Sequence, residues 1–169
     1  MKAGIAIALC CFGLITMSRA QQDSTWDGWN WLIGEWVGEG SGVPGQGSGG
    51  FSLLPDLDGK ILVRKNHSEY PATKDKPAII HDDLMIVYLE NSRAPNDAIY
   101  FDNEGHTIKY VITYPENNIV FTSGKSEAAP VFRLTYIPIE KDYIDVKFEM
   151  SRDGVKFTMY TEGKCRKKK

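Results

Sequence analysis

Cysteine and histidine are scarce in this chain, with three of each among 169 residues. Cys10 and Cys11 lie within the first twenty residues, so only Cys165 remains beyond them. A single cysteine excludes an intramolecular disulfide in that remainder, and no cysteine or histidine pair has the spacing of a structural zinc site. The fold must therefore be stabilised by burial of apolar surface.

Sequence motifs of catalysis are also missing. The chain contains no nucleophile elbow, no glycine-rich phosphate loop and no His-Glu-x-x-His helix. Glu35, Glu39 and Asp58 are too scattered to form an acid/base pair. We therefore name no catalytic residue and favour a protein that is not an enzyme.

An excess of positive charge is absent as well, since 20 Lys and Arg stand against 22 Asp and Glu. The one basic cluster, Lys164–Lys169, has no aromatic residues among its cations. We expect a solvated terminus there and no nucleic-acid partner.

Long apolar runs are missing except at the start, where Ala3–Met17 is almost entirely apolar and follows Lys2. This run is shorter than the roughly 17–25 residues of a spanning helix. Small residues precede a cleavage point after Ala20, as in a secretory signal peptide. We expect residues 1–20 to be removed, and residues 21–169 to form one domain that is periplasmic or extracellular and not inserted in the membrane.

Helical periodicity is absent after Gly34, and short alternating segments take its place. A short helix capped by Ser24 is expected before Gly34. Alternation is clear in the segment 143–150. One face of this segment carries Ile144, Val146, Phe148 and Met150, as in a half-buried strand. The predicted strands cover residues 35–43, 49–56, 60–70, 83–90, 97–102, 106–114, 118–124, 130–139, 142–151 and 154–163.

The connections between these segments carry hairpin residues. Asp58-Gly59 suits a tight turn with positive φ, and Gly105 and Gly154 suit turns closed by a left-handed residue. The one long connection, Pro71–Asp82, is expected to cross an end of the sheet. Because a meander of about ten strands removes its exposed edges by closing, the sequence predicts an all-β, closed up-and-down antiparallel barrel, with the short N-terminal helix plugging one end. A two-layer sandwich is the alternative.

The segment Gly34-Glu35-Trp36, following a short helix, resembles the opening strand of the calycin superfamily. It is especially similar to nitrobindin and to small exported lipocalin-like bacterial proteins, and further similarity covers 58–62, 99–105 and 151–157. The resemblance implies a ten-stranded barrel that can hold an apolar or amphipathic molecule. It also implies that Trp36 packs at the closed end beneath a basic side chain, with Arg166 or Lys164 as the cation.

Nitrobindin-like proteins bind haem through a histidine in the C-terminal part of the barrel. This chain departs from that pattern because no histidine follows His106. We therefore expect no cofactor, and His67 is the remaining candidate for a haem ligand.

Polar candidates for ligand binding lie in the segment 60–70. Arg64, Asn66, Ser68 and Tyr70 share one face, and His67 lies on the other. If the first face points inward, it lines a cavity with groups that orient a ligand; the alternative is that it faces solvent near a strand end. The candidate ligand-binding residues are Arg64, His67, Tyr70, Tyr110 and Tyr136.

Two further clusters have competing interpretations. The carboxylates and imidazole of His81-Asp82-Asp83 are metal ligands by type, but adjacent residues of a strand point to opposite sides. We expect a capped turn leading into Leu84. The tryptophan cluster (Trp26, Trp29, Trp31 and Trp36) forms either a binding surface or, through the indoles of the short helix, a plug in one end of the barrel, and we favour the plug.

Three functions remain open. The favoured one is a non-enzymatic carrier or sensor of a small hydrophobic or amphipathic molecule bound inside the barrel. The second is a structural or interaction barrel whose interior is filled by aromatic side chains. The third is a small barrel enzyme.

Overall fold

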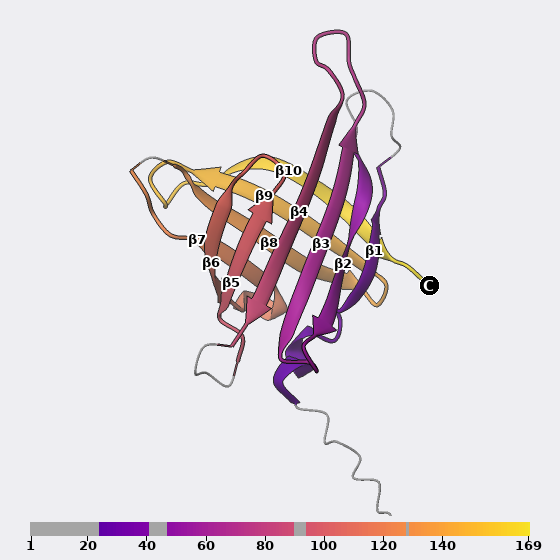
Figure 1. Ribbon diagram of the computed structural model, residues 1–169, viewed down its shortest axis with the longest axis vertical. Helices are drawn as coiled ribbons and strands as arrows, with labels where there is room; N and C mark the ends of the chain where they lie inside the picture. Colours follow the sequence, from indigo (N-terminus) through magenta and orange to yellow (C-terminus); the bar gives the residue numbers. More distant parts are fainter. Residues whose placement is uncertain (1–23, 41–46, 90–93, 128) are drawn as a thin grey trace, which may run out of the picture.

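The computed structural model describes residues 24–40, 47–89, 94–127 and 129–169, and the predicted signal peptide lies outside them. Ten antiparallel strands form a closed barrel in chain order, with β1 hydrogen-bonded to both β2 and β10 (Figure 1). This confirms the predicted closed meander and excludes the sandwich. The strands are β1 (Gly34–Gly38), β2 (Ser48–Asp56), β3 (Ile61–Tyr70), β4 (Ile79–Tyr88), β5 (Asp97–Asp102), β6 (Thr107–Thr113), β7 (Ile119–Ser123), β8 (Val131–Glu140), β9 (Tyr143–Ser151) and β10 (Thr158–Lys167).

The short turns have the geometry that their residues predict. Asp58 and Gly59 both have positive φ, at 54° and 77°, between β2 and β3. Gly105 and Gly154 also have positive φ, at 90° and 77°. Since glycine has no Cβ to clash in this region, the three glycines reverse the chain without strain, whereas Leu57 and Asp58 adopt positive φ as non-glycine residues. Neighbouring strands are therefore antiparallel and adjacent.

The connection between β3 and β4 is shorter than expected. Tyr70 pairs with Ile79 and Ser68 with His81, so β3 ends at residue 70 as predicted, whereas β4 begins at residue 79, four residues before its predicted start. The predicted crossing at Pro71–Asp82 is therefore wrong: Figure 1 shows a hairpin projecting beyond the barrel instead. The turn predicted at His81-Asp82-Asp83 is also wrong, because these residues belong to β4.

The last strand lies four residues later than predicted at each end. Backbone N–H groups of Val155 and Lys156 donate to the Asp153 carboxylate, which holds this stretch in a wide turn before β10. The basic segment is exposed at positions 164, 166, 168 and 169, as expected, but its residues up to Lys167 belong to β10, where Cys165, Arg166 and Lys167 pair with β1. The barrel is thus closed by the last basic residues of the chain.

The N-terminal segment is a six-residue 3-10 helix, η1 (Ser24–Trp29), in place of the longer helix predicted to run to Gly34. Trp29 is 1 % exposed and packs edge-on against Phe121 at 6.0 Å. Trp26 is also buried, and its indole N–H donates to the carbonyl of Gly59 at 2.7 Å. Within the described ranges, no helix is long and apolar enough to cross a membrane.

Candidate functional site

Burial of the inward-facing side chains changes along the barrel. Near η1, Leu62, Val87 and Ile112 are at most 3 % exposed. Further along the same strands, the inward-facing residues are only half-buried. We call this half-buried part of the inner face the mouth; it comprises Asn66, Ser68, His81, Tyr100, Ile108, Phe132, Val146, Phe148 and Met150. One half of the barrel is therefore packed, and the other is accessible to solvent.

One wall of the mouth is apolar. Phe132 and Phe148 stack with their ring centroids 5.7 Å apart, and Tyr160 meets Phe148 edge-on at 5.9 Å. A hollow of about 610 Å³ lies at the β9–β10 turn, outside the mouth except for Met150; its other lining residues are Pro130, Ser151, Arg152, Asp153, Lys156, Thr158, Met159 and Tyr160. Half-exposed aromatic side chains of this kind offer contact area to an apolar molecule.

The opposite wall, from β3 to β5, is polar. His81 lies 3.1 Å from the Tyr100 hydroxyl and 3.1 Å from Glu104, and its Nε2 is 3.5 Å from the Asp83 carboxylate. The interaction with Asp83, assisted by that with Glu104 and opposed by burial, raises the pKa of His81 to about 9. His81 is therefore a cation at neutral pH.

Asp102 extends this network along the rim. Its carboxylate accepts from the Tyr100 hydroxyl at 3.2 Å, contacts His106 at 2.8 Å and accepts from the backbone N–H groups of Glu104 and His106. Burial opposes ionisation of Asp102, but the hydrogen bonds from His106 and Glu104 outweigh it and lower its pKa. The hydrogen-bonding capacity of this carboxylate is satisfied within the protein.

A buried ion pair forms the floor of the mouth. Arg64, 6 % exposed, donates from one terminal nitrogen to Asp83, and its guanidinium lies 5.1 Å from the centroid of the Phe51 ring. Tyr136, 1 % exposed, interacts electrostatically with the same guanidinium. Arg64 Nε and the Tyr136 hydroxyl have no hydrogen-bond partner among the described residues. The hydroxyl and the guanidinium nevertheless interact with each other, in a contact that raises the pKa of Arg64, and both lie wholly within the packed interior.

Three of the residues that the sequence nominated for ligand binding meet inside the barrel: Arg64, Tyr110 and Tyr136. Tyr110 is 3 % exposed and lies edge-on to Tyr100 at 6.2 Å. Burial raises the pKa of Tyr110 and that of Tyr136, so both phenols are neutral donors. The face of β3 that holds Arg64, Asn66 and Ser68 points into the barrel and not toward solvent, the two possibilities that the sequence left open.

The other two nominated residues lie apart from this group. Tyr70 is 37 % exposed at the end of β3, where its ring occupies the space beside Gly47. His67 lies on the outer face of β3, 2.6 Å from Asp82 and 2.9 Å from Glu69. Hydrogen bonds to Glu69 and Asp82 raise the pKa of His67. Because its side chain points away from Arg64, His67 takes no part in the site described here.

The tryptophan of the first strand packs beneath a different cation from the one expected. Trp36 is 2 % exposed, and the ammonium group of Lys167 lies 5.2 Å from its ring. Gly34, at φ 140°, leaves room for Lys167, whose Cε would lie 2.8 Å from a Cβ at that position. Arg166 pairs with Val37 on the outer face, because successive residues of β10 alternate between faces. The expectation that Arg166 covers Trp36 is therefore wrong: the covering cation is Lys167, the next residue of β10.

Sequence reasoning missed His81, Asp83 and Tyr100 as inward-facing residues. The spacing of His81 and Asp83 places both on one face of a strand, but the run of turn-forming residues hid that strand. Ile79 and Ile80, which precede them, were the available signal of an earlier strand start.

The histidines do not fit the haem site considered from the sequence. His67 and His106 have side chains 51 % and 59 % exposed, and each contacts carboxylates. Both ring nitrogens of His81 are engaged, by Glu104 and Tyr100, and a protonated imidazole has no lone pair for a metal. In the part of the chain that the structure describes, no group of three or more His, Cys, Asp or Glu is arranged to hold a metal ion.

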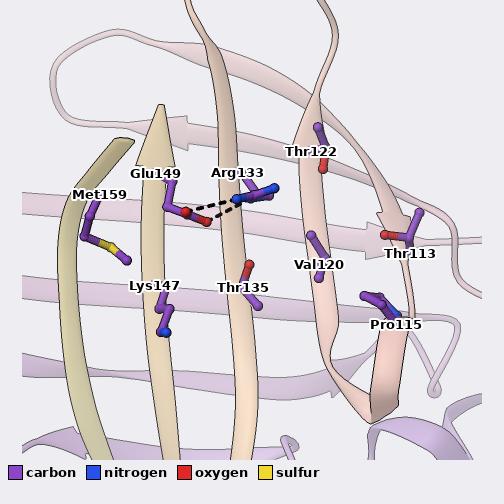
Figure 2. Close-up of a pocket in the computed structure, with 9 residues that line it drawn as sticks. All are labelled: Thr113, Pro115, Val120, Thr122, Arg133, Thr135, Lys147, Glu149 and Met159. Atoms are coloured by element: carbon purple, nitrogen blue, oxygen red, sulfur yellow. Dashed lines mark hydrogen bonds and ion pairs between the residues drawn. The ribbon is translucent and has the colours of Figure 1, made fainter. Parts of the chain in front are cut away.

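A second hollow, of about 480 Å³, lies on the outer face of β6 to β10 (Figure 2). Arg133 crosses it with a bidentate pair to Glu149, at 2.8 and 2.9 Å, and stacks on Phe157 at 3.8 Å. Its remaining lining residues are Thr113, Pro115, Val120, Thr122, Thr135, Lys147 and Met159. None of these residues has a buried polar atom without a partner, so the mouth, and not this hollow, is the better candidate site.

The fold and the site together define a closed ten-stranded barrel with one packed half and one accessible half that has a polar and an apolar wall. No protein-family model matches the chain, and a search of curated proteins finds no match.

Proposed function

We propose that this protein is an exported, non-enzymatic carrier or sensor that binds a small amphipathic molecule in the mouth of its barrel. The observation that carries the proposal is the change in burial along the inner face, from Leu62 at 0 % exposure to half-buried Asn66 on the same strand. Concave inner surfaces with mainly apolar lining and a few convergent polar groups are typical of ligand sites.

The division of the mouth into two walls supports an amphipathic molecule over a purely apolar one. Phe132 and Phe148 supply apolar contact on one side, whereas the other side is lined by the polar network of His81 and Tyr100. A fully apolar ligand would remove water from the charged side chains of this wall and offer them no polar contact, whereas the polar part of an amphipathic molecule can lie against them.

The packed half of the barrel supports a binding site that opens to solvent at one end only. Trp29, Phe121 and Tyr110 form successive edge-on contacts at 6.0 and 6.1 Å across the interior. We propose that η1 closes this end with its indoles, as the sequence suggested, so that ligand enters only through the mouth. The calycin relationship and export through a cleaved signal peptide remain parts of the proposal; the closed ten-stranded barrel supports the first of these.

A neutral fluorescent probe such as N-phenyl-1-naphthylamine tests the proposal by its gain in emission on binding. We expect saturable binding by the wild type, and loss of binding in Ile108→Trp, because the larger side chain fills the mouth from β6. The matched control is Val111→Trp on the same strand, where residue 111 is 56 % exposed on the outer face.

Binding that survives Ile108→Trp unchanged, or is lost equally in Val111→Trp, would contradict a site in the mouth. Absence of binding by the wild type would favour the filled, structural barrel. Circular dichroism of both variants establishes that the barrel is folded before binding is compared.

A further inference from the structure

We propose that the outer face of β2–β6 docks against the same face of a second copy of this chain, so that two barrels pack sheet on sheet as a two-fold symmetric dimer. The proposal concerns the outside of the barrel and does not depend on what the mouth binds. Figure 1 shows these strands in sequence order along one side of the barrel.

The first argument is an apolar patch on the outward side of these strands. Side chains alternate along a strand, and the residues between the members of the patch are largely buried in the interior. The register aligns aliphatic residues in one row across β2–β5, which are Leu54, Val63, Ile86 and Ile99. With the adjacent rows, the apolar patch comprises Leu54, Ile61, Val63, Leu84, Ile86, Tyr88, Ile99, Phe101 and Val111.

The outer face on the other side of the barrel has a different composition. In one row across β7–β9, Thr122 pairs with Arg133 and Arg133 with Glu149. In the next row, Thr135 lies between Val120 and Lys147. Polar residues of this kind are typical of a sheet face that meets water. The apolar patch departs from that pattern, as interaction surfaces do.

The second argument is the size of the patch. Strands lie about 4.8 Å apart and successive outward residues about 7 Å apart, so the patch covers about 500 Å² of each copy. Docking of two copies then buries about 1,000 Å² in total, which is typical of a weak, reversible association. We therefore expect a dissociation constant on the order of 10–100 μM.

The third argument is the charge within the rows of the patch. Lys65 pairs with Leu84 and Lys109 with Ile99, whereas Asp56 and Asp97 also lie in these rows. The two signs balance, so the surface has no positive excess to attract an anionic lipid surface. A surface that carries both signs can instead complement itself across a two-fold axis.

A two-fold axis parallel to β4 fits this arrangement of charges. It brings Val63 of one copy against Ile99 of the other, and it brings Lys109 next to Asp56. The outward residues of β4 then meet their own counterparts, and they are apolar: Leu84, Ile86 and Tyr88. An axis across the strands, through the row of Ile86, would instead place Lys109 opposite Lys109, which charge repulsion disfavours.

Sedimentation equilibrium measures the dissociation constant and tests the proposal. We expect Ile86→Lys to weaken dimerisation at least about tenfold, because two unpaired ammonium groups would be buried at the interface. The matched control is Val120→Lys, a similar exchange at a half-buried position on the outer face of β7, which should dimerise like the wild type. Leu54→Lys, at a residue that is 43 % exposed, serves as a second variant if Ile86→Lys does not fold. Circular dichroism establishes the folding of each.

A charge exchange tests the direction of the axis. We expect Lys109→Glu to weaken dimerisation about threefold, because it faces the second copy's Asp56 with a like charge, and added Asp56→Lys to restore it. Failure of the double variant to recover would overturn the axis parallel to β4.

Two results would overturn the dimer on this face. One is a wild type that stays monomeric at about 1 mM, well above the expected dissociation constant. The other is an equal dissociation constant for Ile86→Lys, Leu54→Lys and Val120→Lys. A monomer that sediments with phosphatidylglycerol vesicles, and loses this property in Leu54→Lys, would assign the patch to a lipid surface instead.

Discussion

At the scale of single residues, the alternation of side chains along β3 and β4 determines which groups meet inside the barrel. Asn66 pairs with Asp83 and Arg64 with Met85, so Arg64 and Asp83 are diagonal neighbours on the inner face. Burial of both charges costs desolvation free energy that their attraction only partly offsets. We therefore expect the intact pair to add little to stability, whereas removal of either partner alone would leave an unpaired buried charge and destabilise the barrel.

His81 gives a prediction at this scale. Its pKa is raised from 6.5 to about 9 on folding, so its contribution to stability is complete below pH 6.5 and is lost as the pH rises to 9 and above. We expect the free energy of unfolding in urea to fall between pH 6.5 and pH 9.5, and His81→Gln to remove part of this dependence.

His67 changes the stability in the same direction, because its pKa is also raised, so His67→Gln is the necessary comparison. An NMR titration of the His81 ring resonances measures the pKa directly. A midpoint near 6.5 would show that the contacts with Asp83 and Glu104 are not formed in solution.

Several residues of the site could be predicted from the sequence because a strand has a period of two. That period placed Arg64, Asn66 and Ser68 on one face of β3, and it placed Tyr110 and Tyr136 on the apolar stripes of their strands. It could not identify Lys167 as the cation over Trp36, because an error of one residue in register exchanges the two faces.

At the scale of elements, β10 is the strand that completes the barrel. Its last residues pair with β1, which has only five residues, and Lys167 also donates to the carbonyl of Trp31 at 3.2 Å. Without these contacts β1 and β10 would become open edges.

Deletion of residues 164–169 removes every residue of β10 that pairs with β1. We expect the thermal midpoint to fall on the order of 10 °C or more, because a loss of several kcal/mol corresponds to about 2–4 °C per kcal/mol in a chain of this size. Deletion of Lys169 alone is the control. Equal midpoints for the two truncations would argue against closure by β10.

The elements themselves were predictable where turn residues stand between strands. Asp58-Gly59 and Gly105 mark reversals at which the strands end as expected. The predicted strand boundaries were wrong in two places. Polar residues lie within β4, and the carboxylate of Asp153 holds a wide turn before β10. In both places, pairing with the neighbouring strand decided the boundary, and local propensity did not.

At the scale of the whole molecule, the barrel combines a packed half and an accessible half. Figure 1 shows η1 at the end of the barrel opposite the projecting β3–β4 hairpin. Because short turns join neighbouring strands, the sequence predicted that the sheet closes into a barrel in chain order. It did not predict which half is accessible, because that depends on how the aromatic side chains from different strands fit together.

The most direct measurement is a set of amide chemical-shift changes recorded while the neutral probe is titrated into the labelled protein. Asn66, Tyr100, Ile108 and Phe132 report on the mouth, and Thr122, Arg133 and Thr135 report on the outer hollow. We expect saturable changes at the first group and none at the second. Changes confined to the outer hollow, or no changes at all, would contradict the binding of a ligand inside this barrel.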